Sequence, residues 1–179
     1  MNMFSLDGRV ALVTGAGRGI GRSVAEGLAG QGAAVACAAR TRAEIDASVA
    51  AIEAAGGRAL AQTLDLADTA AFDGAIRQVL DRWGRIDILV NNAGMNIRQP
   101  IDEVTEESFD RILAVNLKGL YFLSQKVARD MRARRQSKII NVGSLTTGHA
   151  LAKVSVYTAT KGAVGQLTKA QALEFGRDN

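Results

Sequence analysis

The sequence predicts an α/β fold in which one parallel β-sheet lies between two layers of helices. Short, almost wholly apolar runs alternate along the chain with longer segments whose apolar residues recur at helical spacing. Runs that are apolar at successive positions, rather than at every second one, are typical of strands buried on both faces. Pro100 is the single proline in 179 residues, so little interrupts this alternation. Together these features favour a sheet covered by helices on both sides.

Strands and helices are expected to follow one another five times. The expected strands span residues 10–14, 34–39, 59–64, 86–90 and 139–142. The expected helices span about residues 20–30, 42–55, 69–83, 106–131 and 154–175. In the fourth helix most apolar side chains and Asn116 fall roughly on one stripe, as in a helix packed against a core. We expect a single domain over residues 1–179, because the length suits one core and no linker or low-complexity segment divides it.

Composition restricts the class of protein. Hydrophobic residues make up 47% of the chain and charged residues 22%, which is an ordinary globular balance. No apolar run approaches the roughly 18 residues that span a bilayer, and residues 1–8 lack the basic and apolar segments of a secretory signal. The single cysteine, Cys37, has no disulfide partner within the chain, which suits a reducing compartment. We therefore expect a cytoplasmic protein without a membrane partner.

The net charge of +4 brings nucleic-acid binding into consideration. Five cations gather near the end of the fourth expected helix, at Arg129, Arg132, Arg134, Arg135 and Lys138. Cations at a helix C-terminus offset the helix dipole and stay solvated. No aromatic residue is interleaved among them to stack on bases, so we expect no nucleic-acid partner.

A glycine-rich turn follows the first expected strand. Residues 15–21 are Gly-Ala-Gly-Arg-Gly-Ile-Gly, which fits G-x-x-x-G-x-G but not G-x-G-x-x-G, because Ile20 stands in the place of the last glycine. Such glycines permit a tight turn and close backbone approach, and the helix N-terminus that follows faces a pyrophosphate. No Gly-Lys-Ser/Thr follows, which excludes a Walker-type loop. The turn predicts a dinucleotide site, with simple turn glycines as the alternative.

The end of the second expected strand indicates which dinucleotide binds. A cofactor without a 2′-phosphate is usually held there by an Asp or Glu about 20 residues past the glycines. Residues 32–42 contain no acid but carry Arg40 and Arg42, and Arg18 lies in the glycine turn. Guanidinium groups bind phosphate with good geometry. We therefore expect NADP(H), with NAD(H) less favoured; the alternative is that these arginines are solvated surface residues.

Tyr157 and Lys161 lie four residues apart in the last expected helix. At this spacing two side chains share a face, one turn apart. An ammonium at about 4 Å stabilises a phenolate by about 4 kcal/mol at an effective dielectric of about 20, enough to make the phenol a usable acid or base near neutral pH. Ser144 follows an apolar run and would lie at the carboxyl end of a strand. A Tyr and a Lys at this spacing also occur by chance, so the other motifs decide whether this pair is interpreted as catalytic.

Five separated motifs make the chain similar to the short-chain dehydrogenase/reductase family. They are Thr14 with the glycine turn, Asp65-Leu66, Asn91-Asn92-Ala93-Gly94, Asn116, and Ser144 thirteen residues before Tyr157-x-x-x-Lys161. The resemblance runs from about Leu6 to the end of the chain. It implies a Rossmann-type, doubly wound sheet in three layers. It also implies a nicotinamide cofactor and the interconversion of a secondary alcohol and a ketone.

The resemblance implies roles for individual residues. Tyr157 would be the acid/base, while Lys161 would favour its ionised form and hold the nicotinamide ribose. Ser144 would hydrogen-bond the substrate oxygen, and Asn116 would help to position a water in a proton relay. The residues expected to contact the cofactor are Gly15, Arg18, Gly19, Ile20, Gly21, Arg40, Asp65, Leu66, Asn92, Ala93, Gly94, Tyr157 and Lys161. The structural alternative for Asn91 and Asn92 is that they cap a strand end.

The sequence is shorter than members of this family usually are. The resemblance implies another strand, a substrate lid and a final strand beyond Asn179, and a sixth strand is also expected in the doubly wound scheme. We therefore expect the sheet to lack its C-terminal strands and the sequence to be partial. A truncated protein that binds NADP without catalysis is the alternative.

The expected substrate is a sugar acid or polyol. Residues 95–100 and 145–153 would flank the pocket, and their polar side chains suit a hydroxylated or acidic molecule. The stretch Asn-Ala-Gly-Met-Asn-Ile-Arg-Gln-Pro is similar to members of the family that act on sugar acids such as gluconate. The runner-up is a 3-oxoacyl thioester reductase, for which the cations of residues 129–138 would meet an acidic carrier.

Two other classes of site are disfavoured, and a self-association is expected. Ser144 lies in Val-Gly-Ser-Leu-Thr and not in G-x-S-x-G, which disfavours a serine hydrolase. His149 is the single histidine, and we expect no metal site. Apolar residues on more than one face of the last two helices predict a homodimer or homotetramer.

Overall fold

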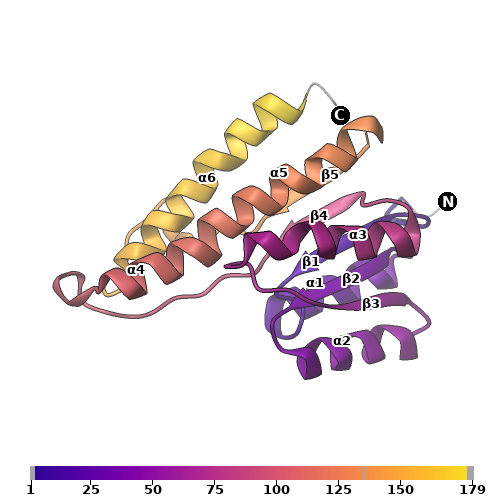
Figure 1. Ribbon diagram of the computed structural model, residues 1–179, viewed down its shortest axis with the longest axis horizontal. Helices are drawn as coiled ribbons and strands as arrows, with labels where there is room; N and C mark the ends of the chain where they lie inside the picture. The colour runs from indigo at the N-terminus through magenta and orange to yellow at the C-terminus, as the bar shows by residue number, and fades with distance from the viewer. Residues whose placement is uncertain (1–2, 135, 177–179) are drawn as a thin grey trace.

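The computed structural model describes residues 3–134 and 136–176, so Arg135 of the cation cluster and the residues at both ends lie outside it. Within this part, five strands form one sheet with the order β3-β2-β1-β4-β5, and all neighbours are parallel (Figure 1). They are β1 (Val10–Thr14), β2 (Ala34–Ala39), β3 (Arg58–Thr63), β4 (Ile88–Asn91) and β5 (Lys138–Asn141). This order matches five of the six strands of the Rossmann fold, which confirms the predicted class.

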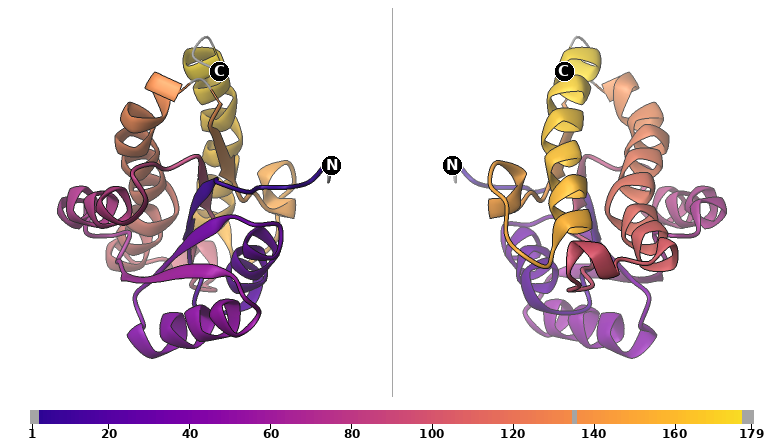
Figure 2. Two further views of the ribbon diagram at one scale, coloured as in Figure 1. Left: turned by 90° about the vertical axis from the view of Figure 1, so that its right-hand side faces the viewer. Right: turned by 90° about the vertical axis from the view of Figure 1, so that its left-hand side faces the viewer.

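Helices cover both faces of the sheet, which gives three layers (Figure 2). The helices are α1 (Gly19–Gly30), α2 (Arg42–Ala54), α3 (Phe72–Trp83), α4 (Glu106–Leu113), α5 (Leu120–Met131) and α6 (Ser155–Phe175). One apolar cluster joins the sheet to α1 and α2, and another joins it to α3 and α5. The long helix expected over residues 106–131 is interrupted, because a π-helical segment, Ala114–Gly119, separates α4 from α5.

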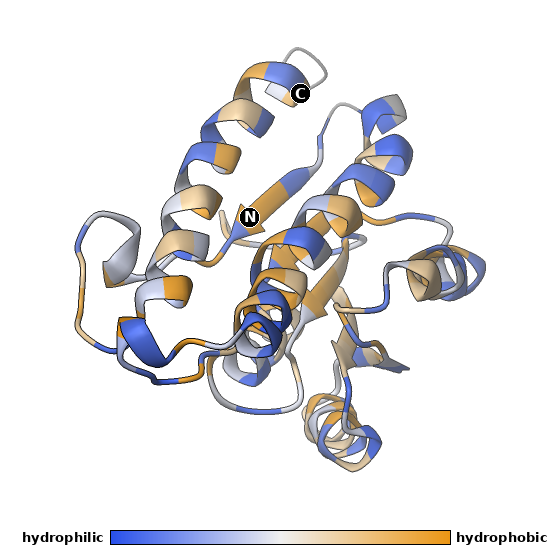
Figure 3. Cartoon of the chain, turned by 60° about the vertical axis from the view of Figure 1, so that its left-hand side comes forward, coloured by the Kyte–Doolittle hydropathy of each residue, from blue (hydrophilic) through white to orange (hydrophobic). Residues whose placement is uncertain are grey.

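The core follows from the alternation of side chains along each strand. In β1 every residue is buried: Ala11 and Val13 join the cluster of α1 and α2, whereas Val10 and Leu12 join that of α3 and α5. A strand buried on both faces must be apolar at successive positions, which is the pattern that predicted it. Figure 3 shows the hydrophobic colour concentrated in the central strands and polar colour on the outer faces of the helices.

β5 is an edge strand among the described residues, and its two faces differ. Ile139 packs against the cluster of α3 and α5, and α6 lies over this face beside α5 (Figure 1). Ile140 lies opposite Val90 in the register and points to the other face, where it is 48% exposed. The sequence predicted this strand from its apolar run, but it did not predict this exposure.

Described residues of the cation cluster at 129–138 contact the protein itself. Arg134 donates hydrogen bonds to the carboxylate of Asp130 and to the carbonyl of Ile86. The guanidinium of Arg132 lies 5.4 Å from the centre of the Phe175 ring.

In the described part of the chain, no helix is both long enough and apolar enough to cross a membrane. Cys37 is fully buried, and this burial, with a smaller effect of the Glu26 charge, raises the pKa of its thiol to about 11.

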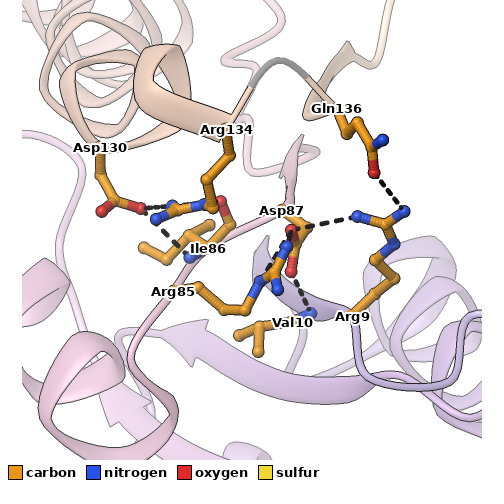
Figure 4. Close-up of polar contacts among 8 residues, drawn as sticks. All are labelled: Arg9, Val10, Arg85, Ile86, Asp87, Asp130, Arg134 and Gln136. Atoms are coloured by element: carbon orange, nitrogen blue, oxygen red, sulfur yellow. Dashed lines mark hydrogen bonds and ion pairs between the residues drawn. The ribbon is translucent and has the colours of Figure 1, made fainter.

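A buried carboxylate joins the amino-terminal ends of β1 and β4 (Figure 4). Asp87, which is 1% exposed, accepts hydrogen bonds from the backbone N–H of Val10 and from the guanidinium of Arg85, and Arg9 lies 3.5 Å away. Burial alone would raise the pKa of Asp87. The hydrogen bonds from Arg85 and Val10 and the charges of both arginines outweigh this effect, so the pKa lies below its ordinary value.

We expect Asp87→Asn to destabilise the protein and to weaken its acid sensitivity. A carboxyl with a lowered folded pKa stabilises the protein above its unfolded pKa, about 3.9, and loses this contribution as the pH falls through the folded value. The variant leaves two arginines without their carboxylate, which costs about 2 kcal/mol at pH 7. Urea unfolding between pH 2 and pH 7 measures both effects. A variant with wild-type stability at pH 7 would contradict this account.

Candidate active site

A cleft of about 310 Å³ opens at the carboxyl ends of the strands. β1 has β2 on one side and β4 on the other, so the order of the strands reverses at β1. The cleft lies at this topological switch point, which is where open α/β sheets bind their ligands. Ten of the residues expected to contact the cofactor line it: Gly15, Arg18, Ile20, Gly21, Arg40, Asp65, Leu66, Asn92, Ala93 and Gly94. Gly19, Tyr157 and Lys161 do not line this cleft.

The glycine turn needs its glycines for two separate reasons. Gly15 and Gly19 have φ of +67° and +54°, a backbone region that residues with a Cβ rarely adopt. Gly21 allows close approach, because a Cβ there would lie 2.2 Å from the carbonyl oxygen of Gly15. α1 then begins at Gly19 with no side-chain cap from Arg18, so its first N–H groups stay available at the cleft. This backbone cradle fits the diphosphate of a dinucleotide.

Thr14 and Asn92 join the glycine turn to the end of β4. Thr14 Oγ1 accepts hydrogen bonds from the backbone N–H groups of Asn92 and Ala93, at 3.0 and 3.1 Å, and donates to the carbonyl of Val90. Asn92 Nδ2 donates to the carbonyl of Thr14 at 3.0 Å. The sequence placed Asn92 at the cofactor, and the structure shows that its amide also ties two strand ends together. The position of the polar Thr14 at the end of a buried strand was the available signal.

The far end of the cleft carries both signs of charge. Arg18 and Arg40 line it as expected, whereas Arg42 lies outside it and donates to the carboxylate of Asp46 at 2.8 Å. Glu44 also lines this end, and its Oε1 lies 3.8 Å from Arg18 Nε. Glu44 lies two residues beyond the acid-free segment 32–42 and was not predicted at the cofactor site. Its position one turn into α2 was the signal that could have found it.

Lys161 lies buried beside Tyr157. Its ammonium donates to the carbonyl of Val142 at 2.7 Å and lies 5.7 Å from the centre of the Tyr157 ring. The residue is 5% exposed, and this burial lowers the pKa of its ammonium. A Cβ on Gly94 would lie 3.9 Å from Lys161 Nζ, so the pair adjoins the end of the cleft that Gly94 lines.

Ser144 follows β5 and begins a 3₁₀ turn, Leu145–Thr147. Its Oγ accepts hydrogen bonds from the backbone N–H and the hydroxyl of Thr146, and its own N–H donates to Thr147 Oγ1 at 3.0 Å. This turn packs against α6, since a Cβ on Gly165 would lie 2.7 Å from Thr147 Cγ2. The turn thus fixes the Ser144 backbone against the helix that carries Tyr157 and Lys161.

Asn116 lies buried in the π-helical segment. Its Oδ1 accepts from the N–H of Met95 at 2.8 Å, and its Nδ2 donates to the carbonyl of Met95 at 2.8 Å and to Thr160 Oγ1 at 3.3 Å. Both amide hydrogens are therefore engaged within the protein. The side chain holds the segment after Gly94 against α6. A polar residue in an apolar stripe was the one sign of this arrangement in the sequence.

Residues 9–179 match the family model described as short chain dehydrogenase. The chain belongs to the short-chain dehydrogenase family. It is 46% identical over 173 residues to the sorbitol dehydrogenase of Cereibacter sphaeroides, which covers 96% of the chain and 66% of that relative. It is 40% identical to the gluconate 5-dehydrogenase of Gluconobacter oxydans, across 98% of the chain and 69% of the relative. The chain thus spans about two thirds of the length of these curated short-chain dehydrogenases.

Solved structures of short-chain dehydrogenases agree with the fold. A gluconate 5-dehydrogenase from Burkholderia cenocepacia, in complex with NADP and tartrate, matches with a TM-score of 0.93 and 40% identity, over 98% of this chain and 69% of that one. A putative short-chain alcohol dehydrogenase from Sinorhizobium meliloti matches with a TM-score of 0.95 and 40% identity, over 98% of this chain and 70% of that one.

We expect Gly21→Ala to weaken dinucleotide binding by at least about tenfold, because overpacking at the turn costs about 1–3 kcal/mol. Gly27→Ala is the matched control: it lies on the same helix, and a Cβ there would meet nothing within 4 Å. Titration of each variant with NADPH, followed by nucleotide fluorescence, measures the dissociation constants. Equal binding by both variants would show that the cradle does not hold the nucleotide.

Proposed function

We propose that the protein is an NADP(H)-dependent oxidoreductase that interconverts a secondary alcohol and a ketone. The observation that carries this proposal is the buried Lys161 ammonium beside Tyr157, next to a cleft whose glycine cradle fits a dinucleotide. The relatives named sorbitol dehydrogenase, gluconate 5-dehydrogenase and L-xylulose reductase support a reaction at a carbinol carbon.

Each residue of the proposed site has one task. A bound nicotinamide would supply or accept the hydride. In the reduction direction, Tyr157 gives its proton to the ketone oxygen while the Ser144 hydroxyl donates a second hydrogen bond to the same atom. Two donors at that oxygen stabilise the charge that develops on it. The Lys161 ammonium stabilises the phenolate that remains on Tyr157 and holds the ribose hydroxyls of the nucleotide.

Asn116 has a different task from the one that its side chain suggests. Because both amide hydrogens bond within the protein, the side chain has no free donor for a water molecule. A π-helical turn shifts the hydrogen-bond register of the helix and is frequent at functional sites. The Asn116 side chain therefore acts on a relay water only indirectly, by holding the segment after Gly94 and α6 in place.

NADP(H) is the favoured cofactor, with NAD(H) as the alternative. Arg18 and Arg40 line the end of the cleft where an adenosine 2′-phosphate would lie, and guanidinium groups suit a phosphate. Two related structures, including a metagenomic short-chain oxidoreductase, are described in complex with NADP. Glu44 at the same end opposes a phosphate. The two cations outnumber it, and its partial pairing with Arg18 reduces its effect.

A polyol or sugar acid is the proposed substrate. The segment after Gly94 and the loop before α6 meet through a backbone hydrogen bond from Gln99 to Lys153, at 3.0 Å. Arg98 and Lys153 are both exposed at this junction, so a carboxylate on the substrate would meet cations there. The names of the sorbitol and gluconate relatives cover both substrate types.

We further propose that the protein acts as a homodimer or homotetramer in the cytoplasm. Tyr121 and Phe122 on α5 are 43% and 36% exposed, and their rings lie 5.3 Å apart. Leu173 on α6 is 78% exposed. Apolar side chains exposed on adjacent helices support burial against a second copy.

The proposed cytoplasmic location rests on the single cysteine, Cys37, which is buried and forms no disulfide in this structure.

We expect Tyr157→Phe to lower kcat by at least about 100-fold, because the ring stays and only the transferred proton is lost. The assay follows NADPH oxidation at 340 nm with a panel of ketoses and keto-acids of sugars. NADPH binding, measured by fluorescence, should remain within about twofold of wild type, since the phenol ring and Lys161 are retained. Full activity in this variant would remove Tyr157 from the mechanism.

We expect Arg40→Ser to raise KM for NADP(H) by about tenfold or more, because a hydrogen bond to a charged group contributes about 1.5–3 kcal/mol. KM for NAD(H), which lacks the 2′-phosphate, should stay nearly unchanged. Arg42→Ser is the matched control, since Arg42 pairs with Asp46 outside the cleft. Initial rates with both cofactors measure the effect. Equal changes in the two variants, or wild-type activity with NAD(H) alone, would contradict the cofactor assignment.

A further inference from the structure

A chain of side-chain hydrogen bonds crosses from β4 through β5 to α6, outside the proposed catalytic groups. Asn91 and Asn141 are the last residues of β4 and β5 and lie opposite each other in the register. Asn91 Nδ2 donates to Asn141 Oδ1 at 2.9 Å. Asn141 Nδ2 in turn donates to Thr168 Oγ1 at 3.0 Å and to Gln171 Oε1 at 2.9 Å, both on α6.

These contacts matter because the second half of α6 has little apolar anchorage. The buried residues of this 21-residue helix are Val156, Thr160, Lys161 and Val164, all within its first half. Beyond Val164 the helix has side chains that are exposed or half-buried. The two hydrogen bonds from Asn141 join the middle of this half to the sheet, and the contact of Arg132 with Phe175 joins its end to α5.

α6 is thus attached to the end of β5 at two points. Lys161 reaches the carbonyl of Val142, and Thr168 reaches the side chain of Asn141, the preceding residue. Lys161 and Thr168 are seven residues apart, so they share one face of the helix two turns apart. Sliding or rotation of α6 along β5 would break both contacts together.

We propose that Asn141 is a positioning residue. It holds α6 against β5 so that the Lys161 ammonium stays shielded from solvent, at the Val142 carbonyl and beside Tyr157. The geometric part stands on the hydrogen bonds alone. The catalytic consequence rests on the proposed oxidoreductase function.

The test removes the two acceptors on α6 and leaves Asn141 and Lys161 unchanged. Thr168→Val with Gln171→Leu keeps similar side-chain volumes but accepts no hydrogen bond from Asn141. The rescue variant, Thr168→Ser with Gln171→Glu, keeps an acceptor oxygen at both places. Asp87→Asn is the control for general loss of stability, because Asp87 lies at the amino-terminal ends of the strands, away from Asn141 at the carboxyl end of β5.

The first readout is the rate at which acetic anhydride labels Lys161 at pH 8, followed by mass spectrometry. The exposed Lys169, on the same helix, is the internal reference. We expect labelling of Lys161 to rise about three- to tenfold in the double variant, because an amine that is 5% exposed becomes accessible to the reagent. This gain in access outweighs the smaller free-amine fraction that follows when solvent raises the pKa of Lys161 toward its ordinary value. Labelling should stay near wild type in the rescue variant and in Asp87→Asn.

The second readout is turnover in the direction of alcohol oxidation with NADP⁺, in which the ionised Tyr157 would be the base. We expect kcat to fall about three- to tenfold in the double variant and the acid limb of its pH profile to move to higher pH, with little change in KM for NADP⁺. Unchanged labelling of Lys161, or an equal rise in Asp87→Asn, would overturn the positioning role. Absence of turnover in the wild type would instead overturn the proposed function, and the labelling comparison would still decide the role of Asn141.

Discussion

The proposed active site depends on one buried charge, the ammonium of Lys161, which lies at the carbonyl of Val142 and beside the ring of Tyr157. A buried ammonium is unfavourable unless polar groups surround it, and here burial does lower its pKa. A carbonyl at the end of β5 compensates part of this cost. The neighbouring phenol completes the arrangement, because its ionised form would supply the opposite charge.

This charge can only be held where it is because the sheet topology brings distant segments together. Parallel strands place the ends of β1, β4 and β5 along one edge, so the glycine turn, the segment after Asn91 and the turn at Ser144 all meet there. Glycines permit the closest contacts, above all Gly21 against the carbonyl of Gly15. The cleft and the catalytic candidates are therefore two parts of the same edge, linked through Gly94 and Asn116.

The sequence was sufficient for the features that have a period or a motif. The bounds of β1 and β2 agree with those expected, because buried parallel strands are apolar at every position. The interruption of the helix at Ala114–Gly119 was not predicted, since the apolar stripe in the sequence continues across it. Glu44 at the cleft and the full engagement of the Asn116 amide depend on the tertiary packing of separate elements, which no local pattern records.

The most direct test is the pH dependence of kcat/KM for alcohol oxidation with NADP⁺, in wild type and in Lys161→Met, which keeps an unbranched chain and removes the charge. We predict that turnover near neutral pH falls at least about 100-fold and that residual activity grows toward alkaline pH, because in this direction the ionised phenol is the base. Wild-type turnover with an unchanged pH profile in Lys161→Met would contradict this prediction.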